Sequence, residues 1–262
     1  MTLNEAGQDI TLNLDMSGAS GEPGDLGAGY QGNGTLAIRD GNTVASKYGY
    51  IGYKKGSTGK ATIEGTGSNW NNSSILYIGH RGNGTLNIKD GGAVSNKYHG
   101  RLGYYADATG EVVVTGEGST WTNDGDLTVG WLGSGEITIL DGGLVSVAKT
   151  LTIDCYTDGD SFINMTSGGM LALYGKGDGS IAEYLAMIEG TGEMRYWNTA
   201  QEEWNNILDA TQGQDYTLSY LNEGDLAGYT MLTVMAVPEP SIAALLIMGA
   251  TGLLAYPRRK RK

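Results

Sequence analysis

The sequence repeats itself at an interval of 50 residues, and each repeat is built from two related halves of about 25. Residues 32–36 (GNGTL) return as residues 82–86, and a diverged third copy begins at Gly133. Glycines and apolar residues both recur at the shorter interval. They are Gly34, Gly59, Gly84, Gly110 and Gly135, and Ile38, Ile63, Ile88, Val114, Ile139, Ile163 and Ile188. This pattern predicts a row of similar units that are stacked on one another.

Each unit contains three short apolar runs that are separated by clusters of Gly, Asn and Asp. The runs alternate between apolar and polar residues, which is typical of strands with one buried face. One run in each unit ends in an apolar residue followed by glycine, and glycine supplies the positive φ that a tight corner needs. These glycines are Gly52, Gly79, Gly103 and Gly130. Three strands and three corners therefore make one coil.

A unit of this size cannot bury its apolar face alone, so the coils must pair their strands in parallel around a shared interior. We predict an all-β fold, a parallel β-helix (β-solenoid) of about seven coils of about 25 residues. Trp70 and Trp121 keep a fixed place in the repeat and are expected in its core. A β-propeller is the main alternative, because its blades repeat at roughly 40 to 50 residues. The half-repeat is too short for a four-stranded blade and favours the β-helix.

The composition fits a folded chain that is held together by packing and backbone hydrogen bonds. Apolar residues make up 40% of the chain and charged residues 18%, which is unlike a disordered sequence. Cys155 is the single cysteine and cannot form an intramolecular disulfide. The net charge of -12 repels phosphate backbones, so we expect no nucleic-acid partner and favour cations or neutral glycans.

The regular pattern ends after Trp197, and we expect a cap at each end of the rod because open strand edges promote aggregation. Residues 1–24 are expected to form a first, irregular coil with a strand at 10–14. Residues 25–197 hold the repeats. Residues 198–236 are expected to form the C-terminal cap: an amphipathic helix at 200–210, then strands at 216–221 and 229–234.

The last part of the chain, residues 237–262, has the order of a short motif, an apolar helix and a basic end. The motif is Pro238, Glu239 and Pro240, and the apolar run covers residues 242–256. A helix of that length spans ~22 Å, short of the ~30 Å of a hydrocarbon core. A basic cluster directly after it nevertheless favours membrane insertion with that end in the cytoplasm. The cluster is Arg258, Arg259, Lys260, Arg261 and Lys262.

This tail closely resembles the PEP-CTERM sorting signal, and the repeats at 25–153 resemble those of PEP-CTERM proteins and autotransporter passengers. The resemblance implies a right-handed β-helix that a Gram-negative bacterium exports to its envelope, surface or extracellular matrix. It also implies that an exosortase, a membrane-embedded cysteine transpeptidase, recognises the motif while residues 242–256 anchor the chain transiently in the inner membrane. Such proteins need an N-terminal export signal that residues 1–18 lack, so we expect the natural protein to begin upstream.

Two groups of aspartates could offer oxygen ligands to calcium. Asp154, Asp158 and Asp160 form one group, and Asp124 and Asp126 form the other. The alternative interpretation is a solvated turn in each case. We expect no other cofactor and no other metal.

Many β-helices are polysaccharide lyases or hydrolases, whose chemistry needs carboxylates or basic groups that converge on one face. The basic and imidazole candidates are His80 with Arg81 and His99 with Arg101, and ordinary loop residues are the alternative. Trp131 and Trp197 could stack on sugar rings if they are exposed. These candidates form no complete catalytic set.

We therefore predict a structural or adhesive surface protein rather than an enzyme, with extracellular polysaccharide as a candidate partner. The alternatives are a carbohydrate-active β-helix enzyme and a module that binds glycans or calcium.

Overall fold

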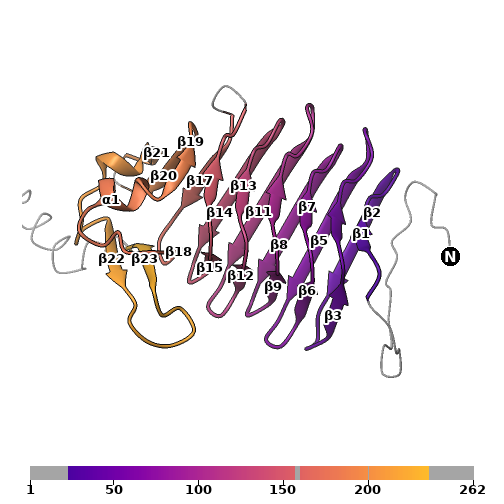
Figure 1. Ribbon diagram of the computed structural model, residues 1–262, viewed down its shortest axis with the longest axis horizontal. Helices are drawn as coiled ribbons and strands as arrows, with labels where there is room; N and C mark the ends of the chain where they lie inside the picture. Colours follow the sequence, from indigo (N-terminus) through magenta and orange to yellow (C-terminus); the bar gives the residue numbers. More distant parts are fainter. Residues whose placement is uncertain (1–22, 157–159, 200, 236–262) are drawn as a thin grey trace, which may run out of the picture.

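A computed structural model describes residues 23–156, 160–199 and 201–235. The chain forms a parallel β-solenoid whose coils are stacked along the longest axis of the molecule (Figure 1). Three sheets run along this rod, and each coil contributes one strand to each sheet. The predicted all-β solenoid and its repeats are confirmed.

The first sheet is parallel throughout and seven-stranded. Its strands are β1 (Leu26–Ala28), β4 (Gly49–Ile51), β7 (Leu76–Ile78), β10 (Gly100–Leu102), β13 (Leu127–Val129), β16 (Leu151–Ile153) and β19 (Ile188–Gly190). The second sheet ends in one antiparallel pair, β20 with β21. Its strands are β2 (Asn33–Ile38), β5 (Thr58–Glu64), β8 (Asn83–Lys89), β11 (Thr109–Thr115), β14 (Ser134–Leu140), β17 (Phe162–Met165), β20 (Glu193–Asn198) and β21 (Glu203–Asn206).

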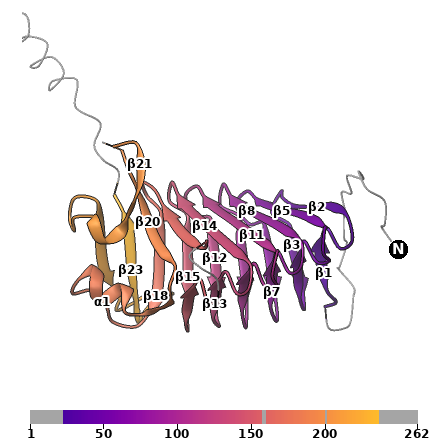
Figure 2. The same ribbon diagram turned by 90° about the horizontal axis from the view of Figure 1, so that it is seen from above.

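The third sheet changes direction at its C-terminal end, where β23 pairs antiparallel with β18 and β22 with β23. Its strands are β3 (Thr43–Ser46), β6 (Asn69–Asn72), β9 (Ala93–Asn96), β12 (Thr120–Asn123), β15 (Leu144–Val147), β18 (Met170–Tyr174), β23 (Tyr229–Val234) and β22 (Tyr216–Tyr220). The described residues therefore form about six turns rather than seven, because β19 and β20 have no third parallel strand after them. Figure 2 shows β18, β20 and β23 together at that end.

Strand register confirms the predicted columns in the first five coils. Gly34, Gly59, Gly84, Gly110 and Gly135 are paired in one row, and so are Ile38, Ile63, Ile88, Val114 and Ile139. The prediction is wrong for the last two apolar residues. Ile163 pairs with Ile137, so Met165 occupies the column, and Ile188 lies in the first sheet opposite Leu151. The regular spacing fails at Ile188 because an unpredicted helix, α1 (Ile181–Leu185), is inserted after β18. This helix does not account for Ile163, which precedes it in the chain.

The interior explains why two coils make one full repeat. Trp70 is fully buried, and a Cβ on Gly49 of the same coil would lie 2.9 Å from its Cζ2 atom. Trp121 and Gly100 have the same relationship two coils later. The intervening coils have medium-sized residues at both places, Leu76 with Val94 and Leu127 with Val145. Because an interior packs at constant density, a large residue requires a small one opposite it.

A buried polar row satisfies the two indole N–H groups. Trp121 Nε1 donates to Asn96 Oδ1 at 2.8 Å, and Asn96 Nδ2 donates to Asn123 Oδ1 at 2.8 Å. Trp70 Nε1 donates to Ser46 Oγ at 3.0 Å. Buried polar groups need such partners, so this row accompanies the tryptophans in the third sheet.

The C-terminal region differs from the prediction in one segment. The prediction of an amphipathic helix at 200–210 is wrong, because β21 and a short 3-10 helix, η1 (Ile207–Asp209), lie in this segment. Trp204 packs edge-on against Trp197 across the β20–β21 pair, with ring centroids 5.3 Å apart, so cross-strand packing overrides the helical spacing. The strands expected at 216–221 and 229–234 are present as β22 and β23.

The predicted strand at 10–14 and the tail at 237–262, with its apolar helix, lie outside the described residues. Within residues 23–156, 160–199 and 201–235, no helix has the length and apolar character needed to span a bilayer.

Candidate functional site

A column of rings follows one corner of the rod. On five successive coils, a glycine forms the corner directly after the first-sheet strand, and an aromatic or imidazole ring follows that glycine. The five residues are Tyr30, Tyr53, His80, Tyr104 and Trp131. Gly52 and Gly79 both have φ of 72°, which turns the chain out of the strand. The next amide still donates to the coil before it, as from Tyr53 to Gly29 at 2.9 Å. The backbone ladder thus holds successive rings in register.

The rings of this column are stacked along the rod. Tyr30 and Tyr53 have centroids 4.8 Å apart and planes inclined by 6°, and Tyr53 and His80 are 4.7 Å apart at 3°. His80 and Tyr104 follow at 5.5 Å, and Tyr104 and Trp131 at 6.1 Å. The first three pairs are offset stacks, each worth about 0.5 to 1.5 kcal/mol beyond burial, and the Tyr104–Trp131 pair is tilted by 33°.

A second column lies beside the first, on the outward face of the first-sheet strands. Its members are in register: Gly27 on β1, then Tyr50, Tyr77 and Arg101 on the next three coils. Tyr50 and Tyr77 are parallel, with centroids 5.4 Å apart. Tyr50 also meets Tyr53 of the first column edge to face at 4.8 Å. The two columns therefore form one continuous aromatic surface.

Cationic side chains lie over these rings. The Arg81 guanidinium is 4.2 Å from the centroid of Tyr105, and that of Arg101 is 4.9 Å from Tyr104 and 5.2 Å from Trp131. Each such cation–π contact is favourable and leaves guanidinium N–H groups available to a ligand. We name the whole surface the aromatic strip. It comprises Tyr30, Tyr50, Tyr53, Tyr77, His80, Arg81, Arg101, Tyr104, Tyr105 and Trp131.

Burial disfavours the charged form of three rings of the aromatic strip, Tyr50, Tyr77 and His80. It raises the pKa of Tyr50 to about 12, with a smaller contribution from the Asp25 carboxylate, and it also raises the pKa of Tyr77. It lowers the pKa of His80, and the Arg81 charge acts in the same direction. The permanent charges of the strip are therefore those of its arginines, which is the opposite sign to the chain's net charge of -12.

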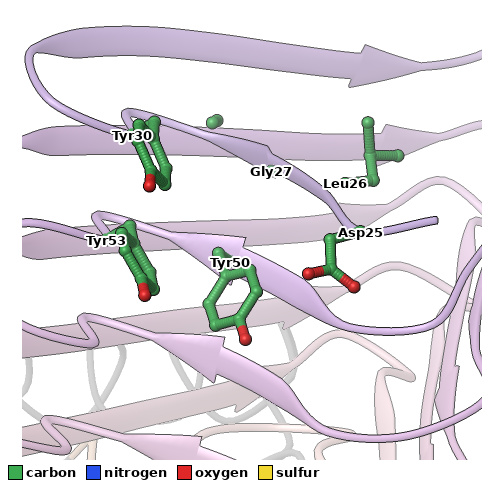
Figure 3. A pocket seen from close by; sticks show the side chains of 7 residues that line it. Asp25, Leu26, Gly27, Tyr30, Tyr50 and Tyr53 are labelled. Atoms are coloured by element: carbon green, nitrogen blue, oxygen red, sulfur yellow. The ribbon is translucent and has the colours of Figure 1, made fainter.

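A cavity of about 300 Å³ lies at the N-terminal end of the aromatic strip, where the first coil has no ring in the second column (Figure 3). Its lining residues are Asp25, Leu26, Gly27, Ala28, Tyr30, Tyr50 and Tyr53.

The predicted catalytic candidates do not come together. His80 is stacked inside the ring column after β7, whereas His99 lies before β10, at the opposite end of the first sheet's strands. His99 Nδ1 is 3.3 Å from Asp126 Oδ2, so this aspartate has a partner within the protein. Arg81 and Arg101 are placed over rings of the aromatic strip instead of beside a pair of carboxylates.

The predicted calcium ligands are in different environments. Asp154 is fully buried with φ of 59°, follows β16 as Gly130 follows β13, and accepts a hydrogen bond from Thr191 at 3.1 Å. Asp160 is exposed and accepts from Ser161 Oγ at 3.2 Å, and Asp158 lies outside the described residues. Across the described part of the chain, no group of three or more His, Cys, Asp or Glu side chains is arranged around a possible metal ion.

The tryptophans divide into two sets. Trp70 and Trp121 are core residues, as predicted. Trp131 belongs to the aromatic strip, and Trp197 packs against Trp204 at the C-terminal end.

Sequence reasoning missed the tyrosines of the strip, although a signal was present. The apolar–glycine pair that marks each corner is followed by an aromatic residue in five coils, as in residues 51–53 (IGY) and 102–104 (LGY). A side chain type that recurs at an outward position on five successive coils indicates a role beyond the core.

No protein-family model, curated protein or solved structure matches this chain.

Proposed function

We propose that this protein is an exported, structural and adhesive β-solenoid whose aromatic strip contacts extracellular polysaccharide at the cell surface or in the matrix. The observation that carries the proposal is the continuity of the strip, in which rings recur from coil to coil and the guanidinium groups of Arg81 and Arg101 lie over them. A surface of this kind suits a polymer better than a small molecule.

The chemistry of the strip supports a glycan partner. A pyranose ring has a face of C–H bonds, which carry small positive charges and fit against the negative face of an aromatic ring. Its hydroxyl groups can exchange hydrogen bonds with phenols and accept them from guanidinium N–H groups. Parallel coils repeat at ~4.8 Å, so one sugar chain would meet several weak contacts that reinforce each other.

A binding role is favoured over catalysis because the strip offers similar contacts on successive coils, whereas a catalytic set is normally assembled once. A lyase and reducing-sugar assay across neutral and acidic polysaccharides separates the two functions. We expect no product, and release of unsaturated or reducing ends would support the enzymatic alternative.

The strip is tested by affinity electrophoresis of the full chain in gels that contain individual polysaccharides. Arg101→Gln and Tyr104→Ala are expected to reduce retardation strongly. Lys60→Gln, on the second sheet, is matched for loss of charge, and Tyr174→Ala, on β18, is matched for loss of an exposed ring. Both controls are expected to migrate like the unaltered protein. Equal loss in the controls, or no retardation by any polysaccharide, would refute the proposal.

The finer features of the fold and its delivery belong to the same proposal. We propose that the coils are right-handed and that residues 198–236 cap the C-terminal end, which the burial of Tyr216, Leu232 and Val234 supports. The order of Pro238, Glu239 and Pro240, the apolar run and the basic cluster supports sorting by an exosortase in the inner membrane.

Intact-mass analysis of the mature protein from its native host tests the sorting. We expect loss of the segment after the motif, and Pro238→Ala is expected to leave that segment in place. A mature protein that still ends at Lys262 would contradict sorting.

A further inference from the structure

The first coil lacks one ring that the next two coils have. Gly27 is in register with Tyr50, which in turn is in register with Tyr77. Tyr77 lies parallel to the Tyr50 ring with centroids 5.4 Å apart, Tyr48 lies 6.1 Å from the same ring at 22°, and Gly27 has no side chain to place beside Tyr50 on the side of the first coil. A Cβ at Gly27 would collide with the carbonyl oxygen of Tyr50, so the backbone itself keeps a larger residue out. The gap is therefore built into the fold.

The gap opens into the cavity of about 300 Å³ at the end of the aromatic strip. Figure 3 shows Tyr30 and Tyr53 on one side of it, Asp25 on the other, and Tyr50 between them. Among the described residues, the lining of the cavity thus combines the Tyr50 ring, the phenol groups of Tyr30, Tyr50 and Tyr53, and one carboxylate. Its volume is at the lower end of small-molecule sites, which hold roughly 300 to 1,000 Å³.

These groups fit a pyranose ring better than a cation. Tyr30 and Tyr53 cover each other's faces, and the ammonium of Lys54 already lies 5.2 Å from the centroid of Tyr30. A cation would find the Tyr50 ring with the positive charge of Lys54 nearby, whereas aromatic cages for cations surround them with several ring faces. A pyranose needs only one ring face, with acceptors for its hydroxyl groups at the edge.

The charge of Asp25 selects among sugars. A carboxylate accepts hydrogen bonds from hydroxyl groups strongly, and it repels a uronate or a sulfate group at the same distance. Asp25 is the charged residue among those that line the cavity. A neutral sugar residue therefore satisfies both the ring and the carboxylate.

We propose that the cavity beside Tyr50, Gly27 and Asp25 binds one neutral pyranose residue of the polysaccharide, stacked on Tyr50 where the first coil has no ring. This inference rests on the proposed function and assigns a sugar class to one end of the aromatic strip. The bound sugar takes the position of the missing ring and so continues the second column by one member.

The test is calorimetric titration of the full chain with cellohexaose, xylohexaose and mannohexaose as neutral probes. A galacturonate hexamer and choline chloride are the acidic and cationic probes. At least one neutral hexamer is expected to bind more tightly than the galacturonate hexamer and choline. Tyr50→Ala is expected to weaken that binding about tenfold, equivalent to about 1.4 kcal/mol of binding free energy, because the ring on which the sugar stacks is lost. Asp25→Asn, an exposed site that leaves the fold intact, is expected to weaken it severalfold. Tyr174→Ala and Asp107→Asn are the matched controls and are expected to bind normally.

The outcomes separate this inference from the proposed function. If Tyr50→Ala and Asp25→Asn bind the hexamer like the unaltered protein while Tyr104→Ala binds less, the sugar lies elsewhere on the strip and only this inference is wrong. Preference for choline or for the galacturonate hexamer overturns it as well. If the unaltered chain binds no glycan at all, hexamers and polysaccharides included, the proposed function itself is refuted.

Discussion

The first and second sheets have the same pattern of inward-facing residues, but their outward-facing residues are of different kinds. Both alternate inward apolar residues with outward ones, and both keep register from coil to coil. The first sheet carries stacked rings and an arginine outward. The second carries short polar and charged side chains in one of its outward columns: Thr35, Lys60, Thr85, Glu111 and Glu136. The interior therefore determines the coil, and a specific contact surface depends on the outward positions alone.

The largest expected effect comes from emptying the interior. Trp121→Ala removes a fully buried indole and leaves Asn96 Oδ1 without its N–H donor, so we expect about 3 to 5 kcal/mol less stability to urea. Trp131→Ala, on the aromatic strip, is expected to lower the free energy of unfolding by about 0.5 to 1.5 kcal/mol. Similar losses for the two variants would show that core and strip are not the separate layers described above.

The pairing of large and small residues inside a coil predicts the next effect. A Cβ on Gly100 would lie 2.5 Å from Asn123 Oδ1, 2.8 Å from Leu127 Cδ1 and 2.9 Å from Trp121 Cζ2, so Gly100→Ala is expected to lower the free energy of unfolding by about 1 to 3 kcal/mol. Gly32→Ala is the control, because nothing lies within 4 Å of the added atom. Adding Trp121→Phe to Gly100→Ala should restore part of the stability if the contact is the cause. Additive losses in the double variant would contradict that explanation.

A smaller effect distinguishes the two faces by pH. Burial holds the pKa of His80 below its ordinary value of 6.5 in the folded chain, so the unfolded chain takes up this proton first as the pH falls. The contribution of His80 to stability is full above pH 6.5 and is lost as the pH drops below it. His80→Phe keeps a ring in the column and should flatten the decline in unfolding free energy between about pH 7 and pH 5. The decline becomes smaller without vanishing, because burial also lowers the pKa of His99.

Lys60→Gln, on the second sheet, is the control for this pH series. Its free energy of unfolding should change with pH as steeply as that of the unaltered protein. An equally steep change in His80→Phe would show that His80 is not the group that titrates.

The repeat made the coil predictable because its signals are local and recur. Gly52 and Gly79 indicate corners, and Ile63 and Ile88 indicate interior positions, in units that have the same geometry. The end of the array escaped prediction because it occurs once. The spacing of Trp204, Ile207 and Leu208 is helical, yet Trp204 pairs with Trp197 across two strands, and the repeat pattern does not predict this pairing.

The candidate site was predictable in part. Arg81 and Arg101 were singled out as basic candidates for catalysis and Trp131 as a ring that could stack on sugars, so the rings and charges were assigned to separate sites. Stacking depends on which residues of different coils share a column, and Tyr53 and His80 come together only because their backbone amides keep the ladder's register. The gap at Gly27 is an absence of a ring, which becomes visible only against Tyr50 and Tyr77.

Hydroxyl-radical footprinting read by mass spectrometry tests the contact surface most directly, because it reports the exposure of individual rings with and without bound polysaccharide. We predict that Tyr50, Tyr77 and Tyr104 become protected, while Tyr174, which is 59% exposed at the other end of the rod, reacts as before. Protection of Tyr174 without protection of the aromatic strip would contradict the account.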